Sequence, residues 1–163
     1  MVIIGIDPGV TTGIAGFNTD TGRFQFGYEF TNMDTKNGQE RLEKFFDHLP
    51  VDVVFVCEDF RLYPRKAQQL SWDQLVPAQV IGMVRVLVGE DPLYFQSASA
   101  IKKHPMTQDV TLGQLGAGEF GRHAKDAARH AVLWAYKNDK IHNAALDALV
   151  YESMLREMTG DAV

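Results

Sequence analysis

The stretch VDVVFVCEDF, which runs from Val51 to Phe60, constrains the fold more than any other. Its central part, Val53–Cys57, is apolar without alternation, which is typical of a strand covered on both faces of a sheet. A second apolar run, Val2–Ile6, comes earlier in the chain. Between them, residues 42–49 have apolar side chains at helical spacing, followed by a proline. A strand, a helix and a strand in this order predict a right-handed parallel crossover, so the two strands lie side by side.

The rest of the chain adds strands and helices to this unit. Thr12–Phe17 and Arg23–Phe30 flank a cluster of turn residues, and they predict two strands that form a meander with the first. Pro77 is suited to the first turn of a helix, and Leu93–Gln96 is typical of a short strand. Four glycines within residues 104–122 indicate a mobile loop.

Two more helices are predicted toward the C-terminus, at Ala124–Tyr136 and Asn143–Met158. The element order is then βββ-α-β-α-β-α-α. It predicts an α/β fold with a five-stranded mixed sheet, three antiparallel strands plus two parallel ones, flanked by helices. We expect a single domain over residues 1–163, because this length suits one core. The core covers about residues 1–137, and the helical extension at about 138–163 is either an added or a dimer-forming helix.

Composition and charge exclude several classes of protein. No apolar run approaches the ~18–20 residues of a membrane span, so no membrane partner is expected. The single cysteine excludes a disulfide framework and, with no recognisable signal peptide, favours the cytoplasm. A net charge of −5 argues against a protein that coats nucleic acid indiscriminately. Basic residues nevertheless gather in three short segments, at 61–66, 96–108 and 122–129.

Two acids end the two central strands. Asp7 follows the first apolar run and Glu58 the second, at the strand ends where sites form in sheets with parallel strands. Adjacent strands lie ~4.8 Å apart, so these carboxylates repel each other unless they share a cation. Oxygen ligands favour Mg²⁺ or Mn²⁺. A third acid is expected from the helix over this edge. Asp126 is favoured, with His123 one turn before it on the same face, and Asp147 is the rival.

Three segments, IGIDPGVTTGIAGF, VVFVCEDF and HAKDAARHA, resemble the motifs of RuvC-like Holliday junction resolvases, in particular the small phage-type members. These belong to the RNase H-like superfamily, and the resemblance covers about residues 2–137. It implies an endonuclease with two Mg²⁺ or Mn²⁺ ions per active site and no small-molecule cofactor. It further implies a homodimer that cuts branched DNA in the cytosol of a bacterium or a phage-infected host. The first motif alone also resembles phosphate-binding ATPases of the actin–hexokinase type.

The resemblance also implies roles for single residues. Asp7 matches the first-strand aspartate, Glu58 the central-strand glutamate and Asp126 the aspartate of the last catalytic helix. His123 stands where some relatives have an acid and others a histidine, so it is a metal ligand, a phosphate contact or a proton donor. His130 faces the same way as Asp126 and is either packed or exposed. Contacts to DNA are expected from residues near these acids, namely Arg61, Tyr63, Arg65, Lys66, Lys102, Lys103, Lys125 and Arg129.

Four functions stay open. The first is a metal-dependent, structure-specific endonuclease that cleaves branched DNA such as Holliday junctions by two-metal phosphodiester hydrolysis. The second is an RNA-processing nuclease of the same fold, like the YqgF relatives. The third is a phosphate-binding ATPase or kinase fragment, which is disfavoured because that fold needs two such domains. The fourth is a non-catalytic DNA-binding module, which is disfavoured because all three acids are present.

Overall fold

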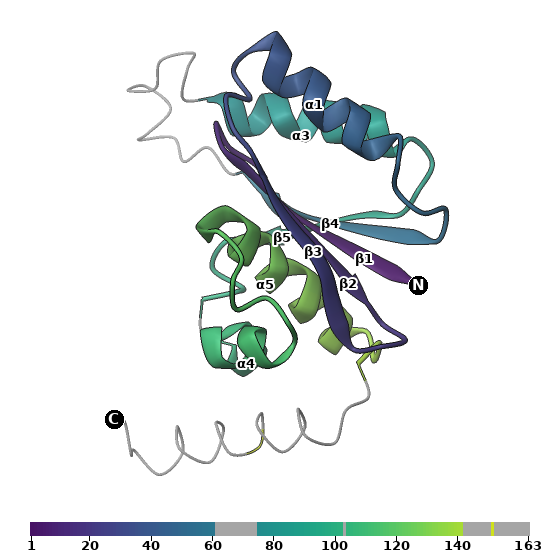
Figure 1. Cartoon of the computed structure of the whole chain (residues 1–163), viewed down its shortest axis with the longest axis vertical. Helices are drawn as coiled ribbons and strands as arrows, with labels where there is room; N and C mark the ends of the chain where they lie inside the picture. Colours follow the sequence, from purple (N-terminus) through teal and green to yellow (C-terminus); the bar gives the residue numbers. More distant parts are fainter. Residues whose placement is uncertain (61–74, 103, 142–150, 152–163) are drawn as a thin grey trace.

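The computed structural model describes residues 1–60, 75–102, 104–141 and 151. Five strands form one sheet: β1 (Val2–Asp7), β2 (Thr12–Asn18), β3 (Arg23–Phe30), β4 (Val53–Asp59) and β5 (Leu93–Ser97). Their order is β3-β2-β1-β4-β5 (Figure 1). The pairs β1–β2 and β2–β3 are antiparallel, whereas β1–β4 and β4–β5 are parallel. The predicted five-stranded mixed sheet is therefore confirmed.

Helices cover both faces of this sheet (Figure 1). The crossover from β1 to β4 passes through α1 (Lys36–Phe46), and the crossover from β4 to β5 passes through α3 (Val76–Val88). These two helices lie on one face. The opposite face carries α5 (Arg122–Lys137), together with the 3-10 turn η2 (Pro105–Thr107) and the short helix α4 (Asp109–Gln114). All but Tyr151 of the predicted 143–158 helix lies outside the described residues.

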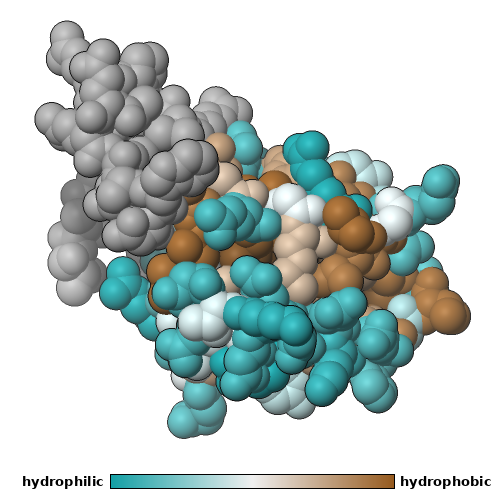
Figure 2. Space-filling model, turned by 90° about the horizontal axis from the view of Figure 1, so that it is seen from above, coloured by the Kyte–Doolittle hydropathy of each residue, from teal (hydrophilic) through white to brown (hydrophobic). Residues whose placement is uncertain are grey.

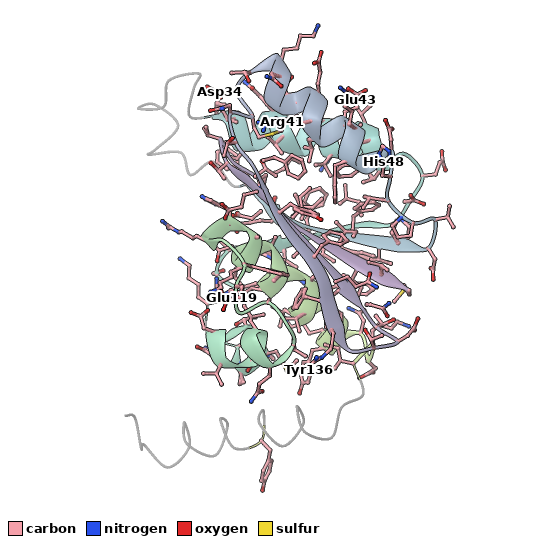
Figure 3. All side chains as sticks on the ribbon, viewed as in Figure 1. Asp34, Arg41, Glu43, His48, Glu119 and Tyr136 are labelled. Atoms are coloured by element: carbon pink, nitrogen blue, oxygen red, sulfur yellow. The ribbon has the colours of Figure 1, made fainter. Side chains whose placement is uncertain are left out.

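Two apolar cores lie on the two sides of the sheet. Ile3 and Ile4 are both fully buried on β1, but Ile4 packs in the core under α1 and α3 while Ile3 packs in the core under α5. This double coverage explains why the central strands lack alternation. Aromatic rings fill the space between α1 and the sheet, whereas Glu43 and His48 lie on the solvent side (Figure 3).

The backbone of α5 packs directly against glycines in β1 and β2, which make room for it. A Cβ at Gly5 would lie 1.9 Å from the carbonyl oxygen of Ala127, and one at Gly13 would lie 2.0 Å from that of His123. Neither distance is compatible with any side chain. The pattern of glycines in the first motif therefore sets how deeply the start of α5 approaches the end of β1.

The segment 104–122, predicted as a mobile loop, is instead largely ordered structure. It contains η2 and α4, and both are anchored by side chains buried in the core under α5, including Met106, Leu112 and Leu115. The glycines misled the prediction, because Gly113 lies within α4 and Gly121 is the N-cap residue of α5. Gly116 follows α4 with a φ of 97°, a conformation that favours glycine.

The start of α1 also differs from the prediction, because the helix begins ahead of its apolar stripe. Thr35 precedes it as the N-cap, and its hydroxyl accepts a hydrogen bond from the backbone N–H of Gly38 at 3.2 Å. The helix ends at Phe46, before Pro50.

Seen over α1 and α3, hydrophilic residues cover much of the described surface, with hydrophobic residues interspersed (Figure 2). Cys57 is buried as predicted, and burial raises the pKa of its thiol. Within the described ranges, no helix is both long enough and apolar enough to cross a membrane.

Candidate active site

A cavity of about 670 Å³ opens where β1 and β4 end. Ile6 and Cys57 are partners in the parallel ladder, so the next residues, Asp7 and Glu58, lie side by side at the ends of these strands. Asp126 and His123 reach the same cavity from the first turns of α5. The structure thus brings together all four residues that were predicted to form the site. The rival acid, Asp147, lies outside the described residues.

Asp7 is the most buried of the three acids. Its side chain is 15% exposed, and its Oδ2 lies 2.9 Å from Nδ1 of His123. Burial raises the pKa of Asp7 to about 6, helped by the negative charges of Glu58 and Asp126 and opposed by the hydrogen bond from His123. The site therefore places two more negative charges beside a largely buried carboxylate.

Glu58 is held by a histidine that sequence analysis left undecided. His130 is fully buried, and its Nε2 lies 3.1 Å from Oε2 of Glu58, while its Nδ1 lies 3.1 Å from Oε1 of Gln96. His123, Asp126 and His130 follow one another at i, i+3 and i+7, and this spacing was the signal for a shared helix face. Gln96 was missed, although a polar residue ending the strand beside Glu58 was visible in the sequence.

Asp126 is paired with an arginine on its own helix. Nη1 of Arg129 lies 2.5 Å from Oδ1 of Asp126, its Nη2 binds Asp109, and its Nε donates to the carbonyl oxygen of Thr107 at 3.1 Å. Arg129 lines the cavity, but its guanidinium is engaged within the protein. Its contact with DNA remains a prediction, and Arg129 would have to give up at least one of these hydrogen bonds to bind a phosphate.

The first turn of α5 is capped by a side chain from a distant strand. Glu29 on β3 accepts hydrogen bonds from the backbone N–H groups of His123 at 2.7 Å and Ala124 at 3.4 Å. Gly121, the N-cap residue, has no side chain for this purpose, and a Cβ there would lie 2.5 Å from the Glu29 carboxylate. Sequence analysis missed Glu29, because 94 residues separate it from His123.

The turn after Asp7 is also fixed by internal hydrogen bonds. The hydroxyl of the buried Thr12 donates to the carbonyl oxygen of Gly9 at 2.9 Å, and it accepts from the N–H of the same residue at 3.2 Å. Pro8 and Gly9 line the cavity. A short turn here leaves the space above Asp7 open.

Basic residues border the cavity on two sides. Lys102 lines it from the segment after β5, and Arg122 lines it from the start of α5, where it had not been predicted. Lys125 lies on α5 and is partly exposed. The remaining predicted contacts to DNA, Arg61, Tyr63, Arg65, Lys66 and Lys103, lie outside the described residues.

The donor set fits a hard divalent cation, although its present arrangement does not enclose one. Among the described residues, no three His, Cys, Asp or Glu side chains are grouped so that they hold one metal ion. Instead, Asp7, Glu58 and Asp126 each bind a base on α5, namely His123, His130 and Arg129. Three carboxylates on one cavity are nevertheless the ligands that Mg²⁺ and Mn²⁺ prefer. A cation would offset both the burial and the repulsion by Glu58 and Asp126 that raise the pKa of Asp7.

Comparison with known proteins supports the fold. No family model and no curated protein matches the sequence. Among solved structures, the chain is similar to T. thermophilus RuvC in complex with a Holliday junction substrate. The TM-score is 0.64 at 19% sequence identity, and the match covers 85% of this chain and 96% of that one. The chain therefore has the RNase H-like fold of RuvC.

Proposed function

We propose that this chain is a divalent-metal-dependent endonuclease that cleaves branched DNA such as Holliday junctions. The observation that carries the proposal is the convergence of Asp7, Glu58 and Asp126, from three separate elements, on one cavity at the ends of parallel strands. The fold is shared with a RuvC that was solved with a Holliday junction substrate, and this likeness is the reason for proposing branched DNA as the substrate.

In this proposal Asp7, Glu58 and Asp126 hold Mg²⁺ or Mn²⁺, and His123 holds the carboxylate of Asp7 in place. When bound, such ions make water more acidic and stabilise the negative charge that develops during hydrolysis of a phosphodiester. The reaction breaks one P–O bond of the backbone and forms another to the oxygen of water. His123 orients Asp7 through Nδ1, and its side chain is 38% exposed, so the rest of the ring is accessible to substrate.

Two features of the cavity suit a DNA backbone. Lys102 and Arg122 lie at its border, where their positive charge attracts phosphates despite the net charge of −5. Pro8 and Gly9 line the cavity beside Asp7, so the turn borders the space in which a phosphate would lie. We further propose that the chain acts as a homodimer, since a four-way junction offers two equivalent strands and a two-fold assembly presents two sites to them.

The proposal is tested with a cleavage panel. Four-way, flapped and single-stranded DNA and structured RNA are incubated with Mg²⁺ or Mn²⁺ and either the wild type or Asp7→Asn. We expect cleavage of the four-way junction by the wild type and its loss in the variant. Intact DNA with both metals would overturn the proposal. Preferential cleavage of RNA would favour the YqgF-like alternative, and tight binding of junctions without cleavage would favour a non-catalytic module.

A further inference from the structure

His130 is a buried ionisable group that the proposed chemistry does not yet use. Its side chain has no exposed surface. It lies in the part of α5 that also contributes small core residues such as Ala127 and Ala131. A buried imidazole is costly unless both ring nitrogens have partners. Both have them here, in Glu58 and Gln96.

The two partners are placed by the sheet itself. Glu58 and Gln96 are direct neighbours in the parallel ladder between β4 and β5, so their side chains project from the same face. The ring of His130 reaches both from α5. The three residues thus join two strands and one helix beside the cavity.

The chemistry of the contact sets the direction of the hydrogen bond to Glu58. An ionised carboxylate only accepts, so Nε2 of His130 carries the hydrogen and donates it. On the other side, the Gln96 amide satisfies Nδ1 in either state of the ring. Its oxygen accepts when Nδ1 is protonated, and its nitrogen donates when the amide is turned over. Gln96 therefore fixes the ring without deciding its charge.

We propose that His130 and Gln96 are positioning residues, which hold Oε2 of Glu58 so that its carboxylate stays directed to the cavity as a metal ligand. This inference rests on the proposed function, because it assumes that Glu58 binds a divalent ion. Hydrogen-bond partners of metal ligands orient them and raise metal affinity, typically by about 10- to 100-fold.

Two substitutions of His130 separate positioning from packing. In His130→Gln the side-chain nitrogen reaches the place of Nε2 and keeps the donor to Glu58. In His130→Asn it reaches only the place of Nδ1, so the bond to Glu58 is lost. Gln96→Leu removes the second partner while His130 stays in place. His48→Gln serves as the matched control, since His48 is exposed on the far side of the sheet, just after α1, and its imidazole contacts only the backbone carbonyl oxygen of Lys44 among the hydrogen bonds described.

The experiment measures Mn²⁺ affinity of the full chain without DNA, by electron paramagnetic resonance, beside thermal unfolding. We expect His130→Asn to weaken Mn²⁺ binding by about 10-fold or more and Gln96→Leu by several-fold, whereas His130→Gln stays close to the wild type. Equal Mn²⁺ affinity in His130→Asn, His130→Gln, Gln96→Leu and the wild type would overturn the inference and leave the proposed function intact.

Two further outcomes are decisive. If His130→Asn and His130→Gln both lose Mn²⁺ affinity, and the loss follows their loss of stability, His130 acts by packing and the inference is wrong. If His130→Asn does not fold, Gln96→Leu decides, because unchanged affinity there contradicts the positioning role. Absence of Mn²⁺ binding by the wild type would instead overturn the proposed function, and the inference with it.

Discussion

The carboxylate of Asp7 destabilises the folded protein, although the proposed function requires it as a metal ligand. It is buried beside two other acids, and its pKa is raised from 3.8 to about 6. A raised pKa means that the folded state binds the proton more tightly than the unfolded state. Folding is therefore penalised progressively from about pH 4 to pH 6, and the penalty is complete at higher pH.

Asp7→Asn removes this penalty, so we expect it to increase the free energy of unfolding near neutral pH by on the order of 1–3 kcal/mol in metal-free protein. The gain should disappear below about pH 4, where the acid is protonated in both states. Urea unfolding in the presence of a chelator at several pH values measures it. A variant less stable than the wild type at neutral pH would contradict the conclusion that the ionised carboxylate of Asp7 destabilises the folded protein.

Substitution of Gly13 tests how closely α5 must approach the sheet. Gly13→Ala places a methyl group 2.0 Å from the carbonyl oxygen of His123, so the start of α5 must shift. We expect a loss of about 1–3 kcal/mol in stability, accompanied by a loss of nuclease activity in the fraction that remains folded. Gly82→Ala is the control, because Gly82 lies within α3 and a Cβ there meets no atom within 4 Å. This change should be neutral or stabilise by up to about 1 kcal/mol in urea unfolding.

At the scale of elements, the cap on α5 comes from another element. Glu29 of β3 binds the N–H groups of His123 and Ala124, so the sheet edge fixes the turn that presents His123 to Asp7. Negative charge at a helix N-terminus also interacts favourably with the helix dipole. The element that carries most of the site is thus oriented at two places, by the glycines beneath it and by the carboxylate at its end.

Glu29→Ala should cost about 0.5–2 kcal/mol of stability, as loss of an N-cap does, and should lower cleavage activity under conditions where the variant stays folded. Glu40→Ala is the matched control, since Glu40 is an exposed acid on α1 whose ion pair with Lys36 is worth about 0.5 kcal/mol or less. Urea unfolding and junction cleavage are measured for both. Equal effects on activity would show that the Glu29 cap does not position the site.

At the scale of the whole molecule, charge is distributed unequally. The chain carries a net charge of −5, yet Lys102 and Arg122 border the cavity that holds the acids. Binding to DNA then depends on local phosphate contacts, since the overall field is repulsive. The salt dependence of binding reports how many such contacts form.

Lys102→Ala and Arg122→Ala should each reduce the slope of log affinity against log salt by about one, with Asp7→Asn as the background to prevent cleavage. Lys36→Ala is the control, because Lys36 lies on α1 across the sheet and pairs with Glu40. Fluorescence anisotropy with a labelled four-way junction measures the slopes. Equal slopes in all the variants would place the DNA on another surface.

The sequence alone determined the order of the five strands with α1, α3 and α5, the parallel crossover and the positions of Asp7, Glu58 and Asp126, because each follows from a local pattern of apolar, turn and acidic residues. Tertiary structure decided the rest. The Glu29 cap and the bridge from Glu58 through His130 to Gln96 depend on residues from different elements, whose approach no local pattern encodes. The same reason explains α4, since burial of Leu112 against a distant core outweighed the glycines around it.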